Sequence, residues 1–353
     1  MAIYFFNLLS IIMFYLFVHM CHVKHKKILF CIYSFIQLSL LSGLRYKVGT
    51  DFLSYARHYE RIVEHGMFYF EFEPGFNLLN LFSHRMNFGF QGVVLLSAII
   101  TVGCIMLVIY MYSDNPLLSV LLYCMLGFYN TSMNQIRTQL AVAIALLSIR
   151  YIKRKNMAKY CLIIVIASFF HVTALVMIPV YFMIYWPLNV KKIMITGIGI
   201  SSALFLVRPI MEFSAKIYPR YSNYINSAFD YGYGIQSLFL IICLCLVIIL
   251  HKKYLLRRNK YNIIYINYAV YGFIVSLFQL QFILMDRFVP YFMLPCAVLG
   301  WPEIQTCYER GISRRGINIL LLAFGFLYCS FIVYRNWNGV VPYQFILTFL
   351  TLA

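Results

Sequence analysis

Long apolar runs recur along the whole chain, and they constrain its fold more than any other feature. A helix that spans a bilayer needs about 20 mostly apolar residues, and about a dozen segments approach that length. Helices satisfy their own backbone groups inside lipid, where water is absent. The sequence therefore predicts an all-α polytopic membrane protein with about 10–12 transmembrane helices, forming a single integral membrane domain over residues 1–353. The candidate spans are 2–22, 28–44, 91–112, 116–133, 136–152, 157–170, 172–187, 191–208, 236–251, 261–284, 287–302 and 317–334.

The composition supports membrane lipid as the surroundings of this chain. Hydrophobic residues make up 63% of it and charged residues 11%, whereas soluble domains carry about a quarter charged residues. The formal charge of +18 could suggest nucleic acid, but the charges stand in short clusters between apolar runs. We therefore expect no nucleic-acid partner. Most of the 10 cysteines lie inside apolar runs without a CxxC pair, which indicates small buried side chains and not a metal or redox site.

Basic clusters between the apolar runs predict the orientation, because Lys and Arg concentrate on the cytoplasmic side of a membrane. With twelve spans and an outer N-terminus, all five clusters fall on that side. Two longer polar segments, about 45–90 and 209–235, then lie on the opposite side with most of the acidic residues. The clusters are Lys24/Lys26/Lys27, Lys153/Arg154/Lys155, Lys191/Lys192, Lys252/Lys253/Arg257/Arg258/Lys260 and Arg310/Arg314/Arg315.

Ionisable groups beside spanning helices are costly, so they are the first candidates for function. The densest set follows the second candidate span, where Arg45 and Arg57 are candidate anion ligands and Asp51 is a candidate general base. Tyr55 could line a path for sugars. The alternative is that Asp51 caps a helix and that the arginines extend to the interface.

Two further polar segments stand at the ends of apolar runs. Glu73 precedes Pro74, which is also a common way to begin a helix. Asn134, Arg137 and Thr138 share one face of a helix and could hold a sugar-phosphate group. The alternative for this second segment is a polar hairpin tip.

Two more candidates lie in the second half of the chain. His171 stands between two short apolar runs and is either a buried core histidine or a base. Arg287 could bind phosphate, or it could simply pair with the neighbouring Asp286. Tyr291, four residues further on, could line the sugar path.

Several classes of enzyme lack their motifs here. The chain has no GxxxxGKS/T loop for ATP, no HExxH or Cys/His cluster for zinc and no GxSxG nucleophile elbow. We expect neither a cofactor nor a metal.

The order of these polar segments resembles the EpsG-type family of polysaccharide polymerases, to which the Wzy-type O-antigen polymerases are similar. The resemblance extends from residue 45 to about residue 343. It rests on five segments in order: Arg45…Val48-Gly49-Thr50-Asp51…Tyr55, Glu73-Pro74-Gly75-Phe76, Asn134-Gln135-Ile136-Arg137-Thr138-Gln139-Leu140-Ala141, Phe170-His171-Val172-Thr173-Ala174-Leu175 and Arg287…Tyr291.

The resemblance implies an enzyme of the bacterial inner membrane that works at the periplasmic face. It would join repeat units carried on undecaprenyl pyrophosphate, would have a GT-C-like architecture with periplasmic loop helices, and could act with a chain-length regulator. On this hypothesis Asp51 is the first choice of general base, followed by Glu73 and His171. The remaining candidates would bind pyrophosphate or sugar without a metal: Arg45, Arg57, Arg137, Arg287, Asn134, Tyr55 and Tyr291.

Other functions remain open at this point. A flippase for the same lipid-linked unit would also use buried arginines, but it should carry polar residues through the membrane depth and an internal repeat. An O-antigen ligase would use the same donor, and only the resemblance separates it from a polymerase. A membrane acyltransferase would use His171 as base and should pair it with a second polar residue, which is not evident.

Overall fold

The structure, a computed structural model, describes residues 1–21, 23–66, 72–187, 235–280, 283–307 and 312–346, together with Pro209 and Glu212. The candidate span 191–208 and nearly all of the polar segment 209–235 lie outside the described residues. The described part is built of helices, and its one β-bridge joins Arg45 to Phe345.

Each candidate span within the described residues coincides with one helix or with consecutive helices. Short 3-10 turns extend several of them. The helices are α1 (Ala2–Met20), α2 (Lys26–Gly43), α5 (Gly89–Tyr112), α6 (Pro116–Met125), α7 (Phe128–Asn134), α8 (Ile136–Leu146), α9 (Ile149–Lys153), α10 (Met157–Ser168), η2 (Val172–Val176), α11 (Met177–Met183), α13 (Ile235–Leu250), α14 (Lys252–Arg258), α15 (Ile263–Leu277), η6 (Ile283–Arg287), α16 (Val289–Pro295), α17 (Trp301–Thr306) and α18 (Ile312–Arg335).

The helices confirm the predicted all-α polytopic membrane protein. In the described part, three helices are each long and apolar enough to cross a membrane: α1, α5 and residues 318–335 of α18. A fourth span exists if α6 and α7, bent by 52° at Gly127, count as one. The other described candidates are single helices that are shorter or less apolar, such as α2 and α13, or are divided into shorter helices. The expected total of about 10–12 spans therefore stays a prediction.

The segment after α2 forms two helices that are not candidate spans, α3 (Phe52–His65) and α4 (Pro74–Arg85). Each has one apolar face. The buried residues of α3 are Phe52, Tyr55, His58 and Ile62, at the spacing of successive helical turns. Their place between two candidate spans fits the loop helices that the resemblance implies, and their periplasmic location stays a prediction.

The chain divides into two compact units, each described here by itself. Unit 1 comprises residues 1–181 and 297–353, and unit 2 comprises residues 182–296. The expectation of a single domain is not tested by this division. In unit 2, α15 packs against α13 and α16, and Asn267 donates to the backbone carbonyls of Ile184 and Trp186.

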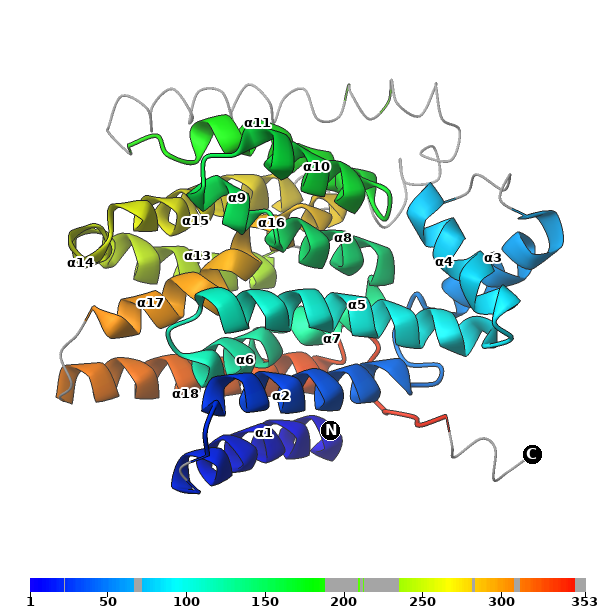
Figure 1. The fold of residues 1–353 in the computed structure, drawn as a ribbon, viewed down its shortest axis with the longest axis horizontal. Coiled ribbons are helices and arrows are strands. Elements are labelled where there is room, and N and C mark those ends of the chain that lie inside the picture. Colours follow the sequence, from blue (N-terminus) through cyan, green and yellow to red (C-terminus); the bar gives the residue numbers. More distant parts are fainter. Residues whose placement is uncertain are drawn as a thin grey trace. The chain divides into compact units, whose positions relative to one another are not determined.

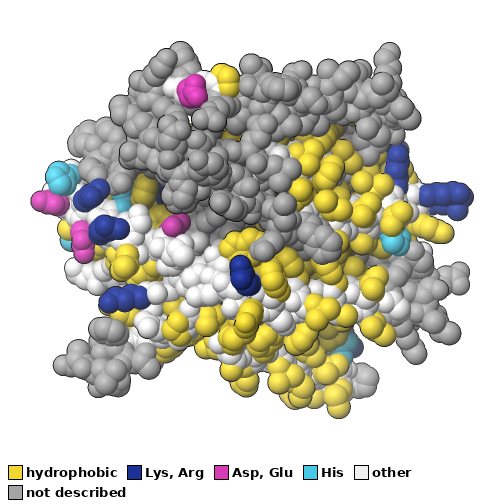
Figure 2. Space-filling model, turned by 180° about the vertical axis from the view of Figure 1, so that it is seen from behind, with side chains coloured by type: hydrophobic (Ala, Val, Ile, Leu, Met, Phe, Trp, Pro, Cys, Tyr) yellow, Lys and Arg dark blue, Asp and Glu magenta, His cyan; other side chains and the backbone are white. Residues whose placement is uncertain are grey.

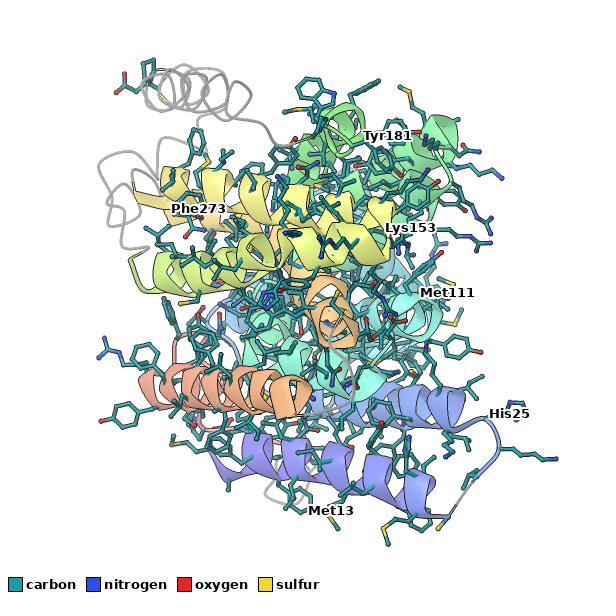
Figure 3. All side chains as sticks on the ribbon, turned by 90° about the vertical axis from the view of Figure 1, so that its left-hand side faces the viewer. Met13, His25, Met111, Lys153, Tyr181 and Phe273 are labelled. Carbon is teal, nitrogen blue, oxygen red and sulfur yellow. The ribbon has the colours of Figure 1, made fainter. Side chains whose placement is uncertain are left out.

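Helix α5 is central to unit 1, where it packs against α2, α4 and α8 (Figure 1). With 24 residues it extends about 36 Å. At its C-terminal end the Lys27 Nζ donates to the Ser113 carbonyl at 2.8 Å, and the Lys153 Nζ lies 5.0 Å from the centre of the Tyr112 ring. Two of the predicted cytoplasmic clusters therefore lie at the same end of unit 1, and Figure 3 looks onto this end.

Unit 1 exposes large apolar side chains along α1 and α18. Figure 2 shows hydrophobic side chains over the lower part of the view, where these helices lie. Phe6 and Met20 of α1 are 68% and 77% exposed, and Leu327 of α18 is 69% exposed. Exposed apolar surface of this extent is typical of helices in contact with lipid.

Candidate functional site

Four of the five polar segments meet in unit 1, at the end where α5 begins. They are the turn before α3, the start of α4, the junction of α7 with α8 and the turn after α10. At two places here, the backbones of segments that are far apart in the sequence come into close contact. Each of these contacts requires a glycine.

Gly75 brings the start of α4 against the end of α10. Its backbone N–H donates to the Phe169 carbonyl oxygen at 2.8 Å, and a Cβ atom on Gly75 would lie 2.7 Å from that oxygen. A side chain would therefore push the two segments apart. This approach places Glu73 beside the residues that follow Phe169.

Gly49 brings the turn before α3 against the end of α7. Its φ of +102° favours glycine, and a Cβ atom would lie 2.8 Å from the Met133 carbonyl oxygen. The Asn134 Oδ1 accepts hydrogen bonds from the Thr50 hydroxyl and from the backbone N–H of Asp51, each at 2.9 Å. Asn134 thus fixes the residue that was the first candidate for a base.

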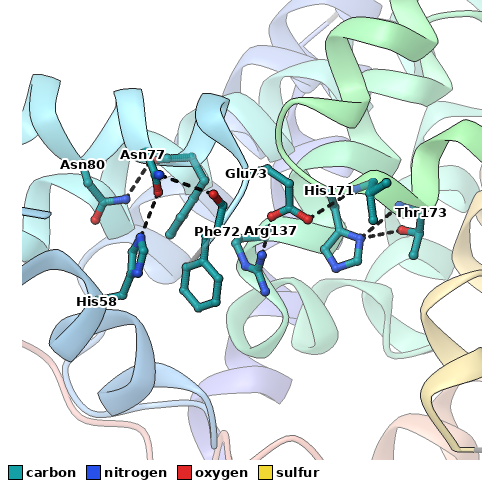
Figure 4. Close-up of polar contacts among 10 residues, drawn as sticks. His58, Phe72, Glu73, Asn77, Asn80, Arg137, His171 and Thr173 are labelled. Carbon is teal, nitrogen blue, oxygen red and sulfur yellow. Dashed lines mark hydrogen bonds and ion pairs between the residues drawn. The ribbon is translucent and has the colours of Figure 1, made fainter. Parts of the chain in front are cut away.

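An ion pair between Glu73 and Arg137 lies at the centre of these segments (Figure 4). The Arg137 Nη1 donates to Glu73 Oε2, and its Cζ lies 3.6 Å from the centre of the Phe72 ring, within the range of a cation–π contact. Glu73 Oε1 accepts from the backbone N–H of Val172 at 3.3 Å. The arginine is therefore held by a carboxylate and an aromatic face at once.

The Glu73 carboxyl stays ionised at neutral pH. Burial raises its pKa, but the Arg137 guanidinium and backbone N–H groups together outweigh burial and hold the pKa below its ordinary value. A carboxylate with a lowered pKa is a weaker proton acceptor. Glu73 therefore suits the orientation of Arg137 better than proton transfer.

His171 is buried and caps the short helix η2. Its Nδ1 accepts from the backbone N–H of Thr173 at 3.3 Å and lies 2.7 Å from the Thr173 hydroxyl. A ring nitrogen that accepts from a backbone N–H carries no proton, so the neutral ring holds its proton on Nε2. The second polar partner that an acyltransferase base would need is present as Thr173, but it contacts the nitrogen used for capping.

Arg45 is only 1% exposed and donates hydrogen bonds to two backbone carbonyls. It donates to the carbonyl and hydroxyl of Ser42, and its Nη2 donates to the Met133 carbonyl at 2.8 Å. Burial lowers its pKa to about 10, so it remains charged at neutral pH. These contacts tie α2 to α7 and are typical of a structural arginine.

The remaining candidates of unit 1 lie on or just before α3. Asp51 is half-buried at the N-cap position and its side chain makes no capping hydrogen bond. Tyr55 is buried in an apolar cluster with Phe76 and Leu140. Arg57 is exposed on the outer face of α3.

Arg287 and Tyr291 belong to unit 2, so the geometry of unit 1 does not include them. Arg287 ends the turn η6 and is half-buried, whereas Tyr291 on α16 is buried. Among the described residues, no group of three His, Cys, Asp or Glu side chains is placed to hold a metal ion.

One buried polar pair was missed by the sequence analysis. His58 on α3 is 1% exposed, and its Nε2 donates to the Asn77 Oδ1 at 2.9 Å (Figure 4). The signal that could have found it is a histidine on the apolar face of an amphipathic helix, since a buried polar group needs a partner.

One comparison with known proteins gives a match. The model of the EpsG family matches residues 27–345, which include all four segments of the site and the fifth in unit 2. No curated protein and no solved structure matches the chain significantly.

Proposed function

The chain belongs to the EpsG family, and on that premise we propose that it is a surface-polysaccharide polymerase, in the first place an O-antigen polymerase. Family membership supports the coarser role of a polysaccharide-polymerase-like membrane protein. The finer proposal is that it joins repeat units carried on undecaprenyl pyrophosphate at the periplasmic face of the bacterial inner membrane. The observation that carries it is the convergence of four polar segments on the Glu73–Arg137 pair.

The reaction is a glycosyl transfer. The bond between the anomeric carbon of the growing chain and its pyrophosphate oxygen breaks, and the electron pair leaves with the lipid pyrophosphate. A new bond forms between that carbon and a hydroxyl oxygen of the next lipid-linked unit, and the hydroxyl proton passes to a base. The protein must therefore supply positive charge for the leaving group and a base near the acceptor.

Arg137 is the best placed cation for the leaving pyrophosphate. A guanidinium has five N–H donors, and Glu73 takes a hydrogen bond from Nη1. Among the described residues the buried Nε has no hydrogen-bond partner, so the guanidinium keeps an unused N–H donor. Because Phe72 and Glu73 fix the guanidinium beforehand, little reorganisation is needed when charge develops.

Asp51 remains our first choice of base, because Asn134 holds its backbone and its side chain is half-buried. Glu73 and His171 are engaged in orienting other groups. Arg45 supports the site from within by holding the Met133 carbonyl beside Asn134. Arg57 is exposed and is proposed to contact the sugars or lipid phosphates. Substrate contacts of Tyr55, Arg287 and Tyr291 stay predictions, because both tyrosines are buried and the two units are described separately.

The surface polysaccharide made by a strain that lacks this gene distinguishes a polymerase from a ligase or a flippase. We expect core lipid bearing one repeat unit in place of the full ladder, and recovery of the ladder on complementation. Loss of every band that carries a repeat unit, down to bare core, would instead indicate a flippase or a ligase and would overturn the proposal.

A further inference from the structure

Phe72 contacts two side chains of different chemistry, a guanidinium and an imidazole. Its face carries the Arg137 guanidinium, with Cζ 3.6 Å from the ring centre. The His58 ring also packs on it, at 4.1 Å between ring centres and an interplanar angle of 38°. The cation at the centre of the site therefore rests on a ring that a buried histidine supports.

A second connection joins the same histidine to the backbone of Phe72. The His58 Nε2 donates to Asn77 Oδ1 at 2.9 Å, and the Asn77 Nδ2 donates to the Phe72 carbonyl oxygen at 3.3 Å (Figure 4). An amide oxygen can only accept, so His58 must carry a proton on Nε2. Because Glu73 follows Phe72 directly, this chain of contacts also fixes the residue that pairs with Arg137.

We infer that His58 is a positioning residue, which acts through Asn77 and Phe72 to hold the Arg137 guanidinium in its catalytic orientation. The inference rests on the proposed function of Arg137. His58 itself is buried in the apolar side of α3 and does not reach the substrate. Burying a histidine and an amide together costs free energy unless both are satisfied, so a purely apolar pair would be the simpler solution if only packing were needed.

The test uses the purified full-length protein in lipid nanodiscs. The substrate is the lipid-linked single repeat unit extracted from the deletion strain, and the rate of chain extension is measured over a range of its concentrations. In His58→Phe the ring remains but the Nε2 donor is lost, so we expect kcat to fall about tenfold, the size of one lost positioning hydrogen bond. KM should change little. The melting temperature should fall, because the buried Asn77 Oδ1 loses its donor, so rates are compared per folded molecule.

Two further variants separate positioning from packing. His58→Gln keeps a donor within reach of Asn77 and should recover most of the rate. Asn77→Asp keeps the acceptor for His58 but loses the N–H that holds the Phe72 carbonyl, so it should reduce kcat like His58→Phe. His65→Phe, which changes an exposed histidine of the same helix, is the matched control and should leave the rate unchanged.

A double-mutant cycle decides whether His58 acts through Arg137. In the Arg137→Lys background, His58→Phe should lower the remaining rate by no more than about twofold, because the planar stacked cation is already gone. Equal fractional losses in both backgrounds, or a wild-type rate in His58→Phe, would overturn the inference. If His58→Phe does not fold, Asn77→Asp decides in the same way. A wild-type rate in Arg137→Lys would instead count against the proposed role of Arg137.

Discussion

At the scale of single residues, burial and partners separate two arginines that look alike in the sequence. Both stand at the ends of apolar runs. Arg45 donates to backbone carbonyls, whereas Arg137 donates to a carboxylate and lies on an aromatic ring. Neither set of partners could be predicted from the sequence, because Met133 and Glu73 lie 88 and 64 residues away from the arginines that they contact. The sequence shows where the charged residues stand, but contacts between distant segments determine which partners each of them has.

The two arginines should respond differently to substitution. Arg45→Ala leaves the buried Met133 carbonyl without its donor, so we expect the folded fraction in membranes and the melting temperature to fall. Arg137→Ala should also lower the melting temperature, because Glu73 loses its partner, but it should abolish chain extension in the molecules that remain folded. Size-exclusion profiles and melting curves of both variants in detergent measure this. A well-folded Arg45→Ala that has lost only its activity would show that Arg45 contacts substrate.

The Glu73–Arg137 pair should make stability depend on pH in one direction. The folded pKa of Glu73 lies below its ordinary value of 4.5. The pair therefore stabilises the fold above that pH, and the contribution disappears as the pH falls through the lower folded pKa. We expect the difference in melting temperature between wild type and Glu73→Gln to be largest near pH 7 and to shrink below about pH 4.

The exposed Glu64 of α3 provides the control for this pH series, because its side chain is 75% exposed. Glu64→Gln should match wild type at every pH. A gap between wild type and Glu73→Gln that is constant from pH 7 to pH 4 would show that the carboxylate charge does not stabilise the fold.

At the scale of elements, the positions of the helices were largely predictable and their junctions were not. Apolar runs are local features, so α1, α2 and α5 begin and end close to the predicted limits. The predicted span 136–152 divides into α8 and α9, and a distinct short helix, α7, ends at Asn134. Where a helix breaks beside a site, its unpaired backbone groups need polar partners. These partners come from other segments of the chain, so the position of the break cannot be read from the local sequence.

The segment after α18 braces the turn that carries Asp51. Gly49 N–H donates to the Gly339 carbonyl at 2.9 Å, and Thr50 N–H donates to the Asn338 carbonyl at 3.3 Å. Gly339 has a φ of +64°, and a Cβ atom there would lie 2.8 Å from the Thr50 methyl carbon. This segment carries neither a charge nor a spanning run, so its sequence predicts no role for it.

Gly339→Ala should therefore displace Thr50 and Asp51 and lower the rate of chain extension per folded molecule by about tenfold or more. Gly89→Ala is the matched control, since Gly89 has a similar φ of +61° but open space around the position of a Cβ atom. Both variants share the cost of the left-handed backbone, so their difference reports the contact with Thr50. Equal rates of chain extension in the two variants would show that the segment after α18 does not position Thr50 and Asp51 for catalysis.

At the scale of the whole molecule, the basic clusters and the site lie at opposite ends of α5 within unit 1. Lys27 and Lys153 reach residues at its C-terminal end, and the polar segments meet near its start at Gly89. If the end with the basic clusters faces the cytoplasm, as the charges predict, the site lies on the outer side of the membrane.

Cysteine labelling tests the orientation. In a background with the exposed Cys21 replaced by Ser, we expect a membrane-impermeant thiol reagent to label Glu64→Cys on α3 in spheroplasts. Arg154→Cys, at the other end of unit 1, should be labelled only after the membrane is permeabilised. The reverse pattern would place the site in the cytoplasm.

The most direct measurement is the polysaccharide ladder made by the deletion strain that expresses Arg137→Ala, beside Arg85→Ala as the control. Both variants remove one arginine, but Arg85 is exposed at the end of α4 and lies outside the site. With equal amounts of protein in the membrane, we expect core lipid with a single repeat unit for Arg137→Ala and a full ladder for Arg85→Ala. A full ladder from Arg137→Ala would contradict the claim that the converged segments form the catalytic site.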